Sequence, residues 1–103
     1  MARIRLGDLA LDPGSCRATL GRSGLDLTSY EFAILLSLAE HAGRVLSRER
    51  LTELAKGNAE EAFDRSIDVQ ISRLHQKLGD DPHNPQRIAT VRGMVFRTIL
   101  PKP

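Results

Sequence analysis

Small, amide and cationic side chains recur between residues 66 and 77 at a spacing that fits one face of a helix. At about 100° per residue, the side chains that gather beside an apolar stripe are those of Ser66, Val69, Gln70, Arg73 and Lys77. This mixture suits base reading in a major groove, because glutamine pairs with adenine, arginine pairs with guanine and valine methyls contact the thymine methyl. An ordinary solvated face has a similar composition, so this segment alone favours neither interpretation.

A second basic segment lies near the C-terminus, where Arg92 precedes Gly93 between two strand-like runs, 87–91 and 95–99. An arginine at the tip of such a hairpin can enter a minor groove, and it can equally serve only to keep an edge strand soluble. The order of two helices, a patterned third helix and a basic hairpin is that of a winged helix. This combination favours DNA binding.

No catalytic or metal-binding motif is visible in the sequence. Cys16 is the single cysteine and carries no local signature of a reactive thiol, so we expect a small buried thiol in a strand. His83 lies near Asp80 and Asp81, but an acidic turn flanked by prolines is usually solvated and offers too few ligands for a metal. The chain is therefore predicted not to be an enzyme and to use no cofactor and no metal.

Two N-capping patterns mark helices ahead of the basic face. Thr28 and Glu31 have the spacing of a capping box, which predicts a helix over 29–42 that ends near a glycine. Ser47 is a second N-cap candidate and predicts a helix over 48–56.

The third predicted helix, over 64–78, has the most regular pattern in the chain. Its apolar stripe recurs at intervals of four, three and four residues, at Ile67, Ile71, Leu74 and Leu78. This is the stripe of a helix packed on a core. Residues 57–63 ahead of it carry little periodicity and predict a surface loop, and the run from Gly79 to Pro82 ends the helix.

Short strands flank the helices on both sides. Apolar pairs alternate with turn residues over 3–27 and predict a small antiparallel platform, and 87–100 predict a terminal hairpin, the wing. With the three helices over 28–78, residues 1–103 are predicted to form a single α+β domain of the winged helix-turn-helix type.

The composition sets limits on the class of protein. Fifteen Lys and Arg against 13 Asp and Glu give a net charge of +2, which permits nucleic-acid binding without demanding it. No apolar run approaches the ~20 residues of a membrane span, and the N-terminus lacks the apolar core of a signal peptide. We therefore expect a cytoplasmic protein with no membrane partner.

Nearly the whole chain resembles the OmpR/PhoB family of response regulators, and the ten-residue run from Arg65 to Leu74 is the most specific match. Further matching stretches are Leu27–Ser29 with Glu31–Ala33, Leu46–Arg48, Leu54–Ala55 with Gly57, and Thr90–Val91 leading to Gly93. The resemblance implies the transcription-regulating effector domain of a two-component system, with helix three in the major groove and the hairpin as a wing.

The resemblance also implies site residues. Carried over by position, the DNA contacts are Arg65, Ser66, Val69, Gln70 and Arg73 in helix three, with Thr90, Arg92 and Gly93 in the wing. Lys77 joins them because it shares the exposed helix face. A loop that contacts RNA polymerase would contain Asn58, Glu60, Glu61 and Phe63.

Two departures from the family pattern qualify these assignments. His75 and Gln76 stand where many relatives have arginines, which predicts weaker and more pH-dependent phosphate binding. Val95 stands where the family usually has a second glycine, and this leaves the turn geometry and the depth of wing insertion open.

The implied partners are double-stranded DNA with direct-repeat half-sites, RNA polymerase, and an N-terminal receiver domain absent from this chain. The isolated domain is expected to be monomeric and to dimerise on DNA. Two alternatives stay open: a winged helix that binds protein, and a stand-alone or membrane-tethered transcription factor. Arg73, Arg92 and the Gln70 amide argue against the first, and only Met94 and Phe96 favour it.

Overall fold

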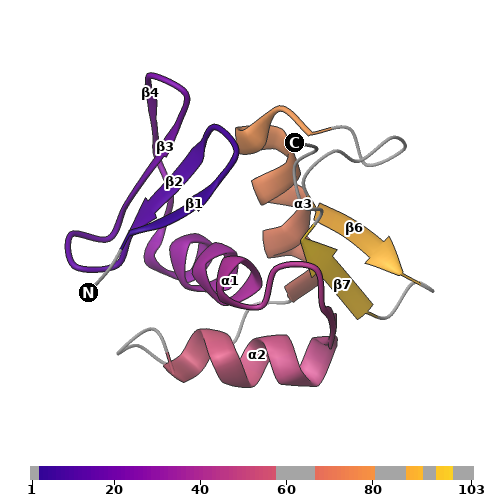
Figure 1. Ribbon diagram of the computed structural model, residues 1–103. Coiled ribbons are helices and arrows are strands. Elements are labelled where there is room, and N and C mark those ends of the chain that lie inside the picture. Colours follow the sequence, from indigo (N-terminus) through magenta and orange to yellow (C-terminus); the bar gives the residue numbers. More distant parts are fainter. Residues whose placement is uncertain (1–2, 58–66, 81–87, 92–94, 99–103) are drawn as a thin grey trace.

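The computed structural model describes residues 3–57, 67–80, 88–91 and 95–98 of the chain. It begins with a four-stranded antiparallel sheet whose strands are neighbours in the order of the sequence (Figure 1). The strands are β1 (Ile4–Leu6), β2 (Leu9–Asp12), β3 (Arg17–Leu20) and β4 (Ser23–Leu25). The predicted N-terminal sheet is thereby confirmed.

The side chains of this sheet alternate between a buried and an outer face. Leu11 and Ala18 are paired across β2 and β3 and are both buried in the core. Ala10 and Thr19, the neighbouring pair, belong to the other face, and Thr19 is exposed. This two-residue period is expected of an antiparallel sheet that covers a core on one side only.

Helix α1 (Ser29–Glu40) lies between the N-terminal sheet and the other two helices (Figure 1). The predicted capping box is present: the Glu31 amide donates to Thr28 Oγ1 at 3.1 Å, and the Thr28 amide donates to Glu31 Oε1 at 2.8 Å. All ten residues from Tyr30 to Ala39 are buried. The helix ends two residues before the predicted boundary, and Gly43, with φ of +83°, follows in the turn.

Helix α2 (Arg48–Gly57) follows directly on a short strand, β5 (Val45–Ser47). Ser47 caps it as predicted, because its Oγ accepts the Arg50 amide at 3.0 Å. Leu51 and Ala55 are fully buried. Ser47 is therefore both the last residue of β5 and the N-cap of α2, so the chain passes from the strand to the helix without a loop.

Helix α3 (Ile67–Leu78) buries the whole predicted stripe of Ile67, Ile71, Leu74 and Leu78. It ends in a Schellman motif: the Gly79 amide donates to Gln76 O at 3.2 Å, and the Asp80 amide donates to His75 O at 2.7 Å. Gly79 has the φ of +67° that this motif requires. The predicted residues 64–66 of this helix lie outside the described part of the chain.

The C-terminal strands are β6 (Ile88–Val91) and β7 (Val95–Thr98), an antiparallel pair as predicted. β5 adds a third strand by pairing with β7, so the second sheet has the order β5-β7-β6. The sequence did not indicate this third strand. The buried Asp80 carboxylate accepts the Ile88 amide at 3.1 Å, which joins the end of α3 to the start of β6.

The position of Cys16 contradicts the expectation of a buried thiol in a strand. Cys16 is exposed in the turn between β2 and β3, with φ of +56°, and its thiol donates to the Pro13 carbonyl at 3.8 Å. The tight turn after Asp12, rather than a strand, determines its environment.

No helix in the described ranges has the length and apolar character needed to cross a membrane.

Candidate nucleic-acid interface

Helix α3 divides into a buried half and an exposed half. Facing the core are the four apolar stripe residues together with Gln70 and His75. The residues classed as exposed are Asp68, Val69, Ser72, Arg73, Gln76 and Lys77. A helix held by a continuous apolar stripe can present its opposite face to a partner without rearranging, so the exposed half is the candidate interface.

Val69 and Arg73 lie one turn apart on this exposed half. Val69 is 47% exposed, which is unusual among the large apolar side chains that the structure describes; Val45, outside this helix, is the other exposed one. Arg73 is exposed as well and forms no ion pair with the described residues. The pair combines a methyl surface with a guanidinium that no carboxylate of the described residues neutralises, a combination suited to base edges and phosphates.

Gln70 does not belong to the exposed face on which the sequence placed it. Its side chain is only 1% exposed, and its Nε2 has no hydrogen-bond partner among the described residues. Gln70 lies at the boundary between the apolar and polar sides of the helix, and packing against the rest of the domain, not periodicity, decided its orientation. The prediction that Gln70 is available to a base is therefore wrong for this conformation.

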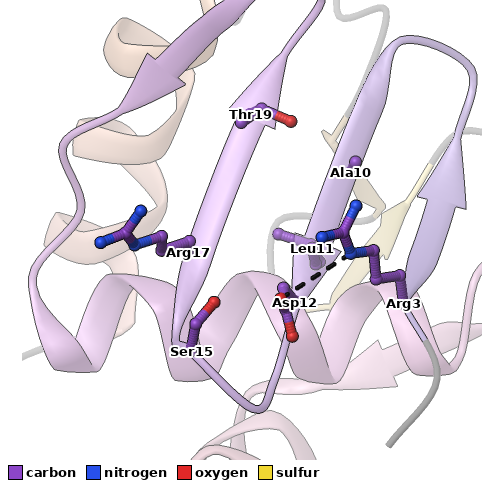
Figure 2. Close-up of a pocket in the computed structure, with 7 residues that line it drawn as sticks. All are labelled: Arg3, Ala10, Leu11, Asp12, Ser15, Arg17 and Thr19. Atoms are coloured by element: carbon purple, nitrogen blue, oxygen red, sulfur yellow. Dashed lines mark ion pairs between the residues drawn. The ribbon is translucent and has the colours of Figure 1, made fainter.

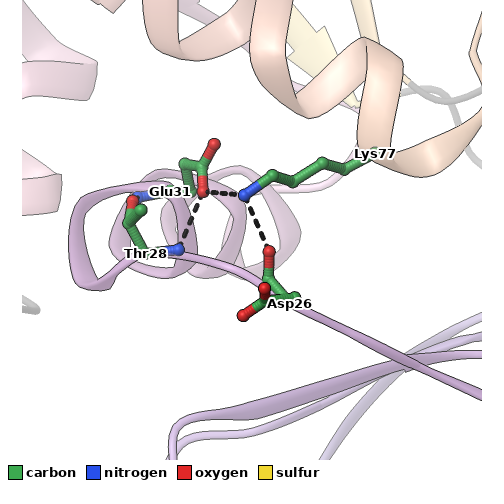
Figure 3. A network of polar contacts seen from close by, with 4 residues as sticks. All are labelled: Asp26, Thr28, Glu31 and Lys77. Carbon is green, nitrogen blue, oxygen red and sulfur yellow. Dashed lines mark hydrogen bonds and ion pairs between the residues drawn. The ribbon is translucent and has the colours of Figure 1, made fainter.

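Lys77 joins a polar network that connects α3 with the start of α1 (Figure 3). Its Nζ donates to Glu31 Oε1 at 2.6 Å and to the Asp26 carbonyl at 2.7 Å. The Glu31 side chain is fully buried, whereas that of Lys77 is 35% exposed. The ammonium group is thus already engaged in joining α3 to the start of α1. A contact of Lys77 with DNA stays a prediction.

The environment of Glu31 favours its charged form. Desolvation by burial is the largest single influence and acts to raise its pKa, but the Lys77 ammonium and the Thr28 amide and hydroxyl act together to hold the pKa below its ordinary value. The carboxylate therefore stays ionised at neutral pH and keeps both ends of the network in place.

His75 is also in the buried half of α3. It is 5% exposed, and neither ring nitrogen has a hydrogen-bond partner among the described residues. A ring in this position cannot reach a phosphate while α3 stays packed. The described structure therefore offers no exposed His75 ring for phosphate binding, and the pH dependence of that binding stays a prediction.

An ion pair links the amino ends of the two helices that build the helix-turn-helix. Arg48 Nη2 lies 2.8 Å from Asp68 Oδ2, joining the first turn of α2 to the first turn of α3. Asp68 also complements the positive end of the α3 dipole. Because the Asp68 side chain is about half exposed, this contact contributes little to stability.

A shallow hollow of 140 Å³ lies on the outer face of the N-terminal sheet (Figure 2). Arg3 and Asp12 form an ion pair of 3.7 Å at its rim, and a hydrogen bond from Ser15 is the main cause that lowers the pKa of Asp12. The hollow is smaller than the ~300 to 1,000 Å³ of small-molecule sites. We assign no ligand to it.

Residues 21–98 match the family described as "Transcriptional regulatory protein, C terminal". The chain belongs to this family. Transcriptional regulatory protein RstA of Escherichia coli K12 is 39% identical over 89 residues, which is 86% of this chain and 37% of RstA. The chain thus spans little more than a third of this relative's length.

Two solved structures show the same winged-helix fold. The DNA-binding domain of Klebsiella pneumoniae RstA, in complex with the RstA box, has a TM-score of 0.83 and 36% identity, over 96% of this chain and 98% of that domain. Thermotoga maritima DrrB, an OmpR/PhoB homolog, has a TM-score of 0.76 and 30% identity, over 94% of this chain and 44% of DrrB. The predicted α+β fold and the OmpR/PhoB resemblance are confirmed, and the family consists of transcription regulators rather than enzymes.

Several predicted site residues of this transcriptional regulatory domain lie outside the described part of the chain. They are Arg65, Ser66, Arg92 and Gly93, together with the loop residues Asn58, Glu60, Glu61 and Phe63. Thr90 lies in β6, in register with Phe96 of β7. Of the predicted contacts in α3, the structure therefore leaves Val69 and Arg73 together on the exposed face.

Proposed function

We propose that the chain binds double-stranded DNA in a sequence-specific manner, as the transcription-regulating output domain of a two-component response regulator. The single observation that carries this proposal is the exposed face of α3, where Val69 and Arg73 lie side by side. The opposite face is fixed in the core by the apolar stripe. The complex of the K. pneumoniae RstA domain with its DNA box supports the same role for this related chain.

The proposal extends to partners. Two domains occupy direct-repeat half-sites about one helical turn apart, and an isolated domain is monomeric and binds weakly. A receiver domain controls this pairing, the loop over 57–63 contacts RNA polymerase, and Arg92 in the wing enters the minor groove. The protein acts in the cytoplasm, where its DNA is found.

Binding-site selection from a random duplex library tests the proposal. At ~150 mM salt, loose electrostatic binding is suppressed, so enriched sequences report base reading. We expect direct repeats at one-turn spacing from the wild-type domain and a loss of that motif with Arg73→Ala. The matched control is Arg50→Ala, since Arg50 is an exposed arginine of α2 whose guanidinium pairs with Glu53 of the same helix.

A selection in which no motif is enriched would contradict the proposed function. A domain that enriches no motif, even when dimerised artificially to remove the cost of weak monomer binding, does not read DNA sequence. The alternative of a winged helix that binds protein would then replace the proposal.

A further inference from the structure

The side of α3 that faces most directly away from the core can be located from its buried residues. We call the line along this side the outermost line of the helix. The six buried residues of the helix centre on one direction, and at about 100° per residue the opposite direction falls between Val69 and Gln76. Both are exposed. Seven residues make nearly two full turns, so these side chains lie on one line, roughly 10 Å apart along the axis.

Ser72 and Arg73 complete this surface. Each lies three or four residues from both Val69 and Gln76, which is the spacing of neighbours on a helix, and each lies roughly 50° from the outermost line, one on either side. Both are exposed. Val69, Ser72, Arg73 and Gln76 thus form one continuous patch, with Val69 and Gln76 along its centre.

Gln70 and Lys77 lie off this patch for reasons visible in the structure. Gln70 is buried with its amide inside the domain, and the Lys77 ammonium is held by Glu31 and the Asp26 carbonyl. Of the two glutamine amides in α3, that of Gln76 is therefore the one that can face a base.

We infer that Gln76 is a specificity-determining residue of this domain, and that its amide reads an adenine while Val69 contacts a thymine methyl about three base pairs away. The inference rests on the proposed function and goes beyond it by naming the bases. A carboxamide presents one donor and one acceptor, which match N7 and N6 of adenine in the major groove. The separation of roughly 10 Å corresponds to about three steps of 3.4 Å along one strand.

The experiment is binding-site selection with the wild-type domain and three variants: Gln76→Ala, Gln76→Glu and Gln70→Leu. The wild type should enrich an adenine column about three base pairs from a thymine column. Gln76→Ala should lose the preference at the adenine column alone, by about 5- to 150-fold, the range for one bidentate base contact. Gln76→Glu should move that column toward cytosine, whose amino group a carboxylate accepts.

Gln70→Leu is the matched control, because it removes a glutamine amide from the same helix on the buried side. It should leave every column of the motif unchanged. Circular dichroism of each variant checks that α3 is retained.

Two results overturn the inference while leaving the proposed function standing. The first is an adenine preference that persists in Gln76→Ala or disappears in Gln70→Leu. The second is an equal loss of affinity for all sequences in Gln76→Ala, which would place the amide on a phosphate. A wild-type selection without any motif contradicts the proposed function itself, and the inference with it.

Discussion

Lys77 Nζ lies 2.6 Å from Glu31 Oε1, so the last turn of α3 is tied to the first turn of α1 across 46 residues of sequence. The same carboxylate oxygen accepts the Thr28 amide that caps α1. One oxygen atom therefore serves both the start of the central helix and the placement of the helix that carries the exposed patch (Figure 3). This arrangement gives Lys77 a positioning role within the fold.

Lys77→Met should destabilise the domain, because the buried Glu31 carboxylate would lose its cation. Breaking a fully buried pair costs about 3 to 5 kcal/mol; since Lys77 is about one-third exposed, we expect a loss of about 2 kcal/mol in the free energy of unfolding, measured by urea denaturation. Lys77→Arg keeps the charge and should lose less. A Lys77→Met domain that unfolds at the wild-type urea concentration would show that the pair does not hold α3.

The salt dependence of DNA binding separates the positioning role of Lys77 from a phosphate contact. Each phosphate contact adds nearly one unit to the slope of log K against log salt. Because the Lys77 ammonium is directed into the domain, Lys77→Met should leave that slope unchanged, measured well below the unfolding temperature. A slope reduced by about one unit would instead place Lys77 on the DNA backbone.

Acid should weaken the domain through Glu31. Its pKa is lowered in the folded state, so its contribution to stability is complete above the unfolded-state pKa of about 4.3 and is lost as the pH falls through the lower folded-state pKa. We expect Glu31→Gln to be less stable than the wild type at pH 7, and the difference to narrow below about pH 4. Urea titrations of both proteins between pH 3 and 7 measure this, and a constant difference would contradict it.

His75→Leu should stabilise the domain by about 1 kcal/mol. The wild-type ring is buried without hydrogen-bond partners among the described residues, and a buried polar group left unpaired costs about 1 to 3 kcal/mol. Leucine fills a similar volume without that cost. The change in DNA affinity between pH 6 and pH 8 should be the same in the wild type and in His75→Leu. A change present only in the wild type would restore the phosphate role for His75.

Features that depend on neighbouring residues could be predicted from the sequence. The capping box of Thr28 and Glu31 and the stripe of α3 involve residues within one or two helical turns, and both are present in the structure. β5 was missed because a three-residue strand has no periodicity of its own. It forms because residues 45–47 pair with β7, some fifty positions further along the chain.

The site was only partly predictable for the same reason. Gln70 and Lys77, seven residues apart, lie at the same edge of the apolar side of α3, where a helical wheel cannot decide between core and solvent. Gln70 is turned inward by packing, and Lys77 is recruited by a glutamate on another helix. Val69 and Arg73 lie farther from that boundary, and their exposure was predicted correctly.

Gly79→Ala should destabilise the domain by about 1 kcal/mol. A Cβ at this position would meet no atom within 4 Å, so the cost comes from the φ of +67°, which L-residues rarely adopt. Gly24→Ala is the matched control, since it also meets open space but has no positive φ, and it should change stability little. Thermal unfolding of both variants measures the difference.

The effect of Gly79→Ala should extend beyond the end of α3. The turn at Gly79 positions Asp80, whose amide bonds to His75 O and whose carboxylate accepts the Ile88 amide of β6. Strain at this turn should therefore speed hydrogen exchange of the Ile88 amide relative to that of Leu11 in the N-terminal sheet. Equal protection of Ile88 in wild type and variant would show that the link between α3 and β6 does not depend on the left-handed conformation of Gly79.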